Sequence, residues 1–230
     1  MKPSWRAVPT IQWALLGGLA LLLGLVQIDQ PYPALAPFQH IPTLALLVAS
    51  PFALRRYPSS TTAVACVVVF FALHTIGGRY TYSNVPYDRW SEALTGRSIT
   101  ATFGFTRNHY DRLVHFSYGL LAVYPIREFL QRHLGIRPRL ALYIAVESVI
   151  AVSTLYELLE WLLSVVLAGP MADDYNGQQG DMWDSQKDMA LATLGALVSA
   201  TGLALRAYRS SGAAGSAGRA GADRNSPPPS

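Results

Sequence analysis

Carboxylates and histidines recur near the ends of several apolar runs in this chain. The set consists of His74, Asp111, His115, Glu157, Glu160, Asp184 and Asp188. An ionisable side chain inside a membrane segment is costly and usually faces a bundle interior or a wet cavity. If successive runs cross a membrane in alternating directions, all of these side chains reach the same half of the bilayer. The pattern therefore predicts a functional site without naming a reaction.

Two pairs in this set have helical spacing. Asp111 and His115 are four residues apart, so the acid can orient the imidazole, or both can ligate a metal. Glu157 and Glu160 are three residues apart, and an apolar interior does not tolerate uncompensated carboxylates. They must bind a cation, carry protons or pair with Arg or His. We predict Asp111, His115, Glu157 and Glu160 as the catalytic residues.

A third group of acids precedes and enters the last apolar run. Asp181, Asp184 and Asp188 share one face if a helix already includes residue 181, and they repel one another unless a cation or arginines compensate them. Asp181 alone also suits a helix cap. Oxygen ligands favour Mg²⁺, Ca²⁺ or Mn²⁺, and a histidine shifts the preference toward Zn²⁺ or iron. The predicted ligands of a divalent metal ion are His115, Glu157, Glu160, Asp181, Asp184 and Asp188.

Two further segments could hold a substrate. Arg107 and Arg112 flank the start of a predicted helix, where cations and the helix dipole favour a phosphate or carboxylate. A salt-bridged helix start is the alternative. Tyrosines that follow the glycine pair after His74 fit either a substrate mouth or an aromatic belt at the membrane interface. The predicted substrate-binding residues are Arg107, Asn108, Arg112, Tyr80 and Tyr82.

Composition explains which elements must carry these residues. The chain is 51% hydrophobic and only 14% charged, with a mean hydropathy of +0.24, which is too apolar for an ordinary soluble domain. A helix needs about 20 apolar residues to cross a bilayer. The apolar runs cover residues 11–28, 38–54, 61–77, about 110–130, about 139–167 and about 184–206. They predict an all-α, polytopic transmembrane helix bundle of about six spanning helices.

The ends of the chain differ in character. The first run could be a signal peptide, but it is long for one, and the small-residue motif lies beyond two prolines, so we expect it to remain as the first helix. Residues 1–209 are predicted to form one transmembrane domain. Residues 210–230 consist mostly of Gly, Ala, Ser and Pro, which predicts a disordered cytoplasmic tail.

The basic residues predict the orientation. Twelve of the eighteen Lys and Arg residues fall on the side of the N-terminus if six helices alternate, so the positive-inside rule puts both termini in the cytoplasm. The longer connections 78–108 and 168–183 are then outer loops, suited to a lid or a substrate mouth. The net charge of +4 follows from this asymmetry, and no basic stripe with interleaved aromatics suggests nucleic acid. The single cysteine, Cys66, excludes an intrachain disulfide.

Four ordered strings resemble a known family. GGRYTYSNVP, RNHYDRLVHFSYG, YELLEW and GQQGDMWDSQKDM are similar to segments of the YjdF-like bacterial inner-membrane proteins, over about residues 10–206. HFSYG, YELLE and residues 188–195 more remotely resemble the VanZ-like family, which is associated with glycopeptide resistance. The chain departs from that pattern at Asp111, where a lysine is common. The resemblance implies a multi-pass protein of the bacterial inner membrane and implies no reaction.

Two functions fit these residues. The first is a membrane enzyme that works at the outer face on a lipid-linked or amphiphilic substrate with a divalent metal ion. The alternative is a small transporter or a cation- or proton-binding membrane protein. A transport path should stay polar toward the inner face, where Arg127, Glu128 and Glu147 offer little. We expect membrane lipids as partners and no nucleic acid, and the oligomeric state stays open.

Overall fold

The protein is a bundle of helices. The computed structural model describes residues 7–167 and 179–224, and no strand occurs among them. Its helices in chain order are α1 (Thr10–Leu25), α2 (Ala36–Arg56), α3 (Thr61–Arg79), α4 (Tyr87–Thr95), α5 (Ile99–Phe103), α6 (Tyr110–Leu134), α7 (Pro138–Leu167) and α9 (Asp184–Arg224). The predicted all-α class is confirmed.

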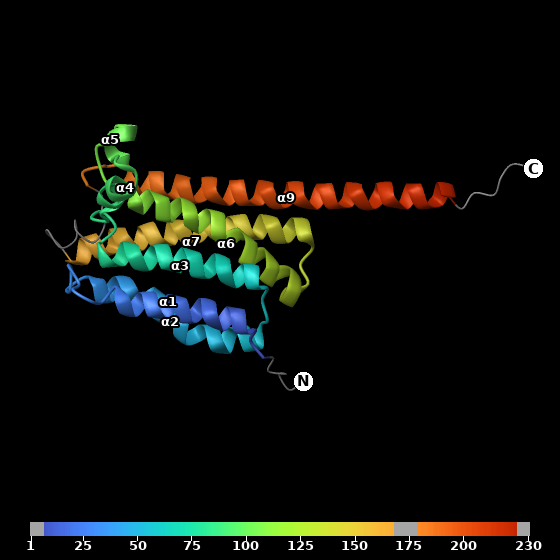
Figure 1. The fold of residues 1–230 in the computed structure, drawn as a ribbon, viewed down its shortest axis with the longest axis horizontal. Coiled ribbons are helices and arrows are strands. Elements are labelled where there is room, and N and C mark those ends of the chain that lie inside the picture. Colours follow the sequence, from blue (N-terminus) through green and yellow to red (C-terminus); the bar gives the residue numbers. More distant parts are fainter. Residues whose placement is uncertain (1–6, 168–178, 225–230) are drawn as a thin grey trace, which may run out of the picture.

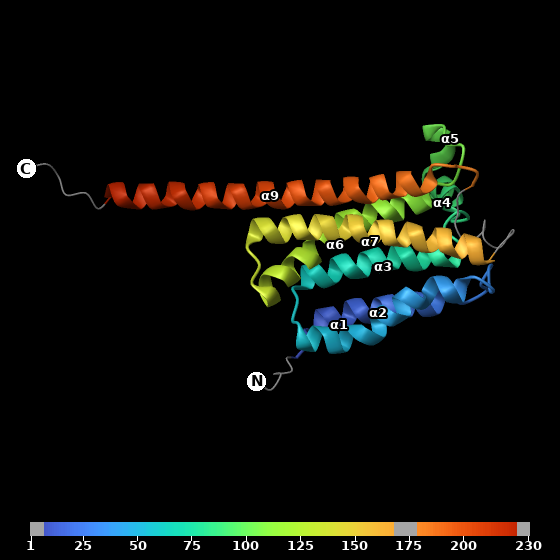
Figure 2. The same cartoon turned by 180° about the vertical axis from the view of Figure 1, so that it is seen from behind.

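The long helices lie alongside one another. Helix α6 packs against α3, α7 and α9, while α1 and α2 pack against each other and against α3 (Figure 1). The short helices α4 and α5 sit at one end of the bundle, and α9 projects far beyond the opposite end. The view from behind shows the same order (Figure 2). We call the end with α4 and α5 the site end, and the other end the basic end.

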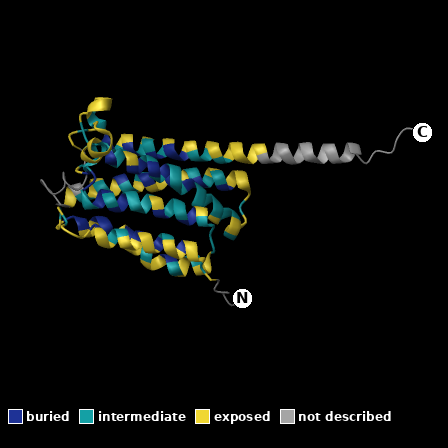
Figure 3. Ribbon diagram, viewed as in Figure 1, coloured by how far each residue is buried: buried dark blue, intermediate teal, exposed yellow. Residues whose placement is uncertain are grey.

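Four of the described helices are long and apolar enough to cross a membrane. They are α2, α3, residues Pro138–Leu163 of α7 and residues Asp184–Arg209 of α9. Helix α1 is apolar but has only 16 residues, whereas α6 has 25 residues and several charges. Large apolar side chains cover the outward faces: Leu155 is 63% exposed and Trp161 is 65% exposed (Figure 3). This surface suits a lipid environment.

Helices α6 and α9 approach each other closely because each presents a glycine. A Cβ on Gly119 would lie 1.9 Å from the carbonyl oxygen of Ala192, and a Cβ on Gly195 would lie 2.2 Å from that of Phe116. Small residues at such a crossing let two backbones touch. The close approach brings the N-terminal ends of α6 and α9 together at the site end.

A second link joins α3 to α6 at the basic end. The backbone N–H of Ser60 donates to Glu128 Oε1 over 2.6 Å, and the Ser60 hydroxyl donates to Glu128 Oε2 over 2.5 Å. The same hydroxyl accepts a hydrogen bond from the N–H of Ala63 and so caps α3. Helix α6 ends at Leu134, and the following Gly135, with a φ of +67°, closes the helix before α7.

The element bounds extend the predictions in two regions. The predicted outer loop 78–108 contains α4 and α5, which the apolar pattern does not signal. Most of the second predicted loop, residues 168–178, lies outside the described residues. Helix α9 passes the predicted domain boundary at residue 209, and the division into a domain and a disordered tail stays a prediction.

Candidate functional site

The candidate site forms where α6 and α9 begin. Both helices start at the site end, and α3 and α7 finish there, as their directions in Figure 1 show. Alternating directions therefore bring the first turns of two helices beside the last turns of two others. Polar residues of these four helices lie at this end of the bundle.

One group of side chains comes together between α6 and α9. Asp111, His115 and Asp188 offer ligand atoms that all lie within 4.8 Å of one another, and we call these three residues the Asp–His cluster. His115 Nε2 lies 3.6 Å from Asp111 Oδ1 and 3.6 Å from Glu157 Oε1 of α7. These distances exceed those of hydrogen bonds, and they are separations at which two side chains can ligate one ion.

Two carboxylate oxygens at this cluster are buried without a hydrogen-bond partner. They are Oε1 of Glu157 and Oδ1 of Asp188, and the two residues are only 5% and 3% exposed. A buried polar atom of this kind requires an explanation, because its lost hydration is not replaced. A proton or a bound cation would provide the compensation.

The second group is an ion-pair network on the solvent side of the cluster. Arg107 binds Asp184 through two nitrogens, at 2.5 Å and 3.1 Å. Arg112 lies 2.5 Å from Asp181 Oδ2 and 3.3 Å from Asp184 Oδ1, and Lys187 lies 2.6 Å from Asp181 Oδ2. We call these five residues the Arg–Asp network. Its carboxylates are compensated by three cations.

Asp181 also holds the turn that precedes α9. Its Oδ1 accepts a hydrogen bond from the N–H of Trp183 over 3.1 Å. The hydrogen bond from Lys187 lowers the pKa of Asp181 from its ordinary value to about 2, with further lowering from the Trp183 N–H and Arg112. A carboxylate held in this way stays charged at neutral pH, which is the state that the network needs.

A cavity of about 630 Å³ reaches the Asp–His cluster from the interior of the bundle. Asp111 and His115 line it at the site end together with His74 and Tyr82. The Tyr82 hydroxyl is hydrogen-bonded to His74 Nδ1. The remaining lining is almost entirely apolar and comes mainly from α3, α6 and α7. The arrangement combines a polar head with a long apolar body.

The turn that carries Tyr82 is strained. Thr81 and Tyr82 have φ angles of +49° and +54°, although both are buried and neither is glycine. The ring of Tyr82 lies so close to α3 that a Cβ on Gly77 would be 2.6 Å from it. Strained, fully packed turns are common where a side chain must be held in a working position.

The predicted catalytic residues separate slightly. Asp111, His115 and Glu157 lie together, whereas Glu160 is half-buried one turn further along α7, within electrostatic range of Asp111 and Glu157. Of the predicted metal ligands, Asp188 joins the Asp–His cluster. Asp181 and Asp184 instead belong to the Arg–Asp network, where they contact arginines.

The predicted substrate-binding residues mostly have structural contacts. Arg107 and Arg112 bind the two aspartates. Asn108 Oδ1 accepts from the N–H of Tyr110 over 2.9 Å, and its Nδ2 donates to the carbonyl of Val85 over 2.8 Å. Tyr80 packs edge-on against Trp90 of α4, whereas Tyr82 lines the cavity.

Sequence reasoning missed one buried histidine. His40 of α2 accepts from Gln27 Nε2 over 2.9 Å through Nδ1 and donates from Nε2 to the carbonyl of Thr75 over 3.1 Å. Its ring packs on Gly78, where a Cβ would lie 3.1 Å away. Both ring nitrogens are satisfied, so this histidine ties α1, α2 and α3 together. Its isolation in an apolar run was the available signal.

Comparison with known proteins agrees with a membrane protein. The model of the DUF2238 family, described as a predicted membrane protein, matches residues 11–209. The chain belongs to the DUF2238 family. The inner membrane protein YjdF of Escherichia coli (strain K12) is 36% identical over 151 residues, which are 65% of this chain and 68% of that protein. No solved structure matches the chain significantly.

These matches bear on the resemblances seen in the motifs. The YjdF-like resemblance is confirmed, and this DUF2238 protein is a membrane protein with several apolar helices. The remote similarity to the VanZ-like family stays an interpretation of the motifs.

Proposed function

We propose that this protein is an enzyme of the bacterial inner membrane that uses a divalent metal ion to act on an amphiphilic or lipid-linked substrate from the outer face. The ion is held by the Asp–His cluster, with Glu157 beside it. The observation that carries the proposal is the convergence of three ligating side chains from α6 and α9, next to unpartnered carboxylate oxygens, at the head of an apolar cavity.

The donor set supports a metal ion. Tetrahedral zinc holds its ligand atoms about 3.4 Å apart, whereas opposite ligand atoms of a six-coordinate ion such as Mn²⁺ lie up to about 4.4 Å apart. Atoms within 4.8 Å of one another need only a small contraction to reach that geometry. One imidazole with several carboxylates suits Mn²⁺, Zn²⁺ or Fe²⁺ better than Mg²⁺.

The chain's own residues would divide the chemistry. A bound ion would supply Lewis-acid activation of a phosphoryl or carbonyl group. Glu157, which is 3.6 Å from His115, is positioned to hold or release a proton beside the reacting group. His74 and Tyr82 face the same end of the cavity and offer hydrogen bonds to the polar head of a substrate.

The apolar body of the cavity supports an enzyme over a transporter. Beyond Tyr118 the α6 residues that line the cavity are Leu121, Ala122, Pro125, Ile126, Phe129 and Leu130, none of which carries a polar side chain. A path for ions or protons needs polar groups or water along its length. The α6 lining therefore fits an apolar pocket for an amphiphile better than a path for ions or protons.

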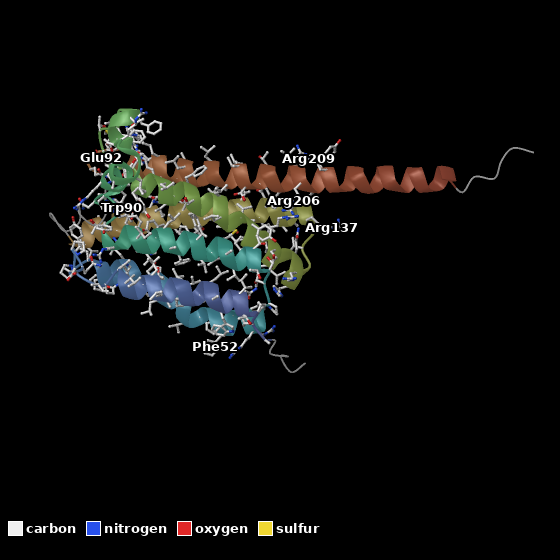
Figure 4. The ribbon with its side chains drawn as sticks, viewed as in Figure 1. Phe52, Trp90, Glu92, Arg137, Arg206 and Arg209 are labelled. Atoms are coloured by element: carbon white, nitrogen blue, oxygen red, sulfur yellow. The ribbon has the colours of Figure 1, made fainter. Side chains whose placement is uncertain are left out.

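The proposed topology has six spanning helices and both termini in the cytoplasm. Helices α1 and α6 run beside the four apolar spans, and α6 is about 37 Å long at 1.5 Å per residue. Arg137, Arg206 and Arg209 gather at the basic end, opposite Trp90 and Glu92 (Figure 4). The positive-inside rule assigns the basic end to the cytoplasm.

Metal analysis of the detergent-purified full chain tests the proposed function. Wild type should contain close to one equivalent of a transition metal by mass spectrometry after loading with Mn²⁺ or Zn²⁺ and desalting. The Glu157→Gln, Asp188→Asn double variant should lose it, while Asp181→Asn, which changes an acid of the neighbouring network, should keep it.

Three outcomes would argue against parts of this assignment. Metal-free wild type would overturn the metal site. Equal loss in Asp181→Asn and in the double variant would extend ligation to Asp181, as the sequence predicts. Retention of metal by a folded double variant would move the site elsewhere.

Thiol labelling tests the topology in a Cys66→Ala background. A cysteine replacing the exposed Asn84 should react with an impermeant reagent from the periplasm. A cysteine replacing Arg137 should react only after the cells are permeabilised. The reverse pattern would overturn the proposed orientation.

A further inference from the structure

The cavity follows one face of α6 over almost its whole length. Its α6 lining recurs at helical spacing: Asp111, His115, Tyr118, Ala122, Ile126 and Phe129. From Asp111 to Phe129 the helix rises about 27 Å. Half of a bilayer's hydrocarbon core is about 15 Å thick, so the cavity extends past the membrane midplane.

The cavity is narrow for its length. Dividing its volume of about 630 Å³ by about 27 Å gives a mean cross-section of about 23 Å², which corresponds to a width of about 5 Å. This volume is the space open to atom centres, and carbon atoms in contact lie about 3.5–4.0 Å apart, so the width admits extended hydrocarbon along the whole cavity.

The walls of the cavity match a hydrocarbon in chemistry. Phe70 of α3, Val152 of α7 and Pro42 of α2 face the α6 residues, and the polar groups concentrate at the site end. A hydrocarbon chain placed there would leave its polar head at Asp111 and His115.

We propose that the cavity binds the unbranched hydrocarbon part of a lipid, extended along α6, with the lipid's polar head at the Asp–His cluster. The position of the head rests on the proposed function, whereas the position of the chain rests on the cavity alone. An extended carbon chain advances about 1.25 Å per bond, so about 27 Å accommodates a chain of about 22 carbons.

Photocrosslinking measures where such a chain ends. The probes are alkyl phosphates of 8 and 16 carbons that carry a diazirine at the terminal carbon, bound to the full chain in detergent. The 8-carbon probe reaches about 9 Å from Asp111 and should label residues near Tyr118. The 16-carbon probe reaches about 18 Å and should label residues between Ala122 and Ile126.

A blocking variant sharpens the test. Ala122→Phe fills the cavity about 16 Å from Asp111. Labelling of Ile126 by the 16-carbon probe should therefore fall at least tenfold, while the 8-carbon probe should still label Tyr118. Val67→Phe blocks the cavity from α3 and covers the case in which Ala122→Phe fails to fold. The matched control is Leu194→Phe, which adds the same ring at a position that is 50% exposed on α9.

Each outcome decides the inference. The inference is supported if the longer probe labels residues further along α6 and if the blocking variants abolish that labelling. Labels that ignore chain length, or that fall on outward-facing Leu155 and Leu194, overturn it. Metal analysis of the labelled wild type separates the two proposals: labels that follow chain length in protein without bound metal keep the chain site and reject the metal site. Bound metal with scattered labels does the reverse.

Discussion

Two groups of acids lie next to each other at the site end, and they are compensated in opposite ways. In the Arg–Asp network, two carboxylates contact three cations. In the Asp–His cluster, Asp111 and Asp188 share one histidine, and Glu157 adds a third carboxyl group within 3.6 Å of its ring. The described residues bring no Arg or Lys into an ion pair with that cluster.

The difference indicates separate roles. A carboxylate that already has short bonds to arginine has little left to offer a ligand, and the network holds the starts of α6 and α9 together. Buried carboxylates without such bonds are costly, and a protein retains them where a proton or ion is to be held. The network therefore holds the two helix starts together, beside a cluster whose carboxylates form no ion pair with an Arg or Lys of the described residues.

The largest expected effect comes from breaking the network. Arg107→Met keeps much of the side-chain volume but leaves the buried Asp184 with only its longer contact to Arg112. Removing one partner of a buried ion pair is strongly destabilising, so the free energy of unfolding in detergent should fall by about 3 kcal/mol. Denaturant unfolding followed by tryptophan fluorescence measures it.

The control and the contrast use the same assay. Arg97→Met, at an exposed arginine between α4 and α5, should change stability by less than about 0.5 kcal/mol. Asp188→Asn should leave stability unchanged or raise it, because it removes a buried repelling charge. If Asp188→Asn destabilises as much as Arg107→Met, the two groups do not differ in the proposed way.

A smaller effect is expected from separating α6 and α9. Gly119→Ala puts a methyl group within contact distance of the α9 backbone, so the helices must move apart at a cost of about 1–3 kcal/mol. Because both groups bridge these helices, metal content should fall with stability. Gly202→Ala is the control, since no atom lies within 4 Å of its added Cβ. If Gly119→Ala is destabilised but binds as much metal as wild type, the geometry of the Asp–His cluster does not depend on the close approach of α6 and α9.

The smallest effect concerns pH. Because the pKa of Asp181 is lowered in the folded protein to about 2, its stabilising contribution is present above its ordinary pKa near 3.8 and is lost as pH falls toward 2. The melting temperature of wild type should decline more steeply over that window than that of Asp181→Asn. If the melting temperatures of wild type and Asp181→Asn fall in parallel with pH, the contacts of Asp181 with Lys187 and Arg112 do not stabilise the folded protein.

Much of the architecture could be predicted from the chain itself. Apolar runs identify the long helices because a helix that contacts lipid must be apolar over about 20 residues. The spacing of Asp111 and His115 predicts a shared face, since residues four apart on a helix are neighbours. Helices α4 and α5 were not predicted, because a short helix in a polar loop has no long apolar run to reveal it.

The three aspartates near residue 181 show where such reasoning stops. Their spacing predicts one stripe, but α9 begins at Asp184, so Asp181 lies in the preceding turn and faces Lys187 and Arg112. Asp184 then pairs with Arg107, which is 77 residues away in the chain. Periodicity describes a single helix and carries no information about which cation a neighbouring helix supplies.

The sequence by itself determined the helical membrane class and the concentration of acids and histidines at one end, because both depend on the order of apolar and polar residues along the chain. The tertiary structure decided which acids are neutralised and which remain available. That choice depends on the close crossing at Gly119 and Gly195, which sets the distances between side chains of different helices. Salt bridges and ligand bonds form only over a few ångströms, so those distances decide which acids pair with a cation of the chain and which do not.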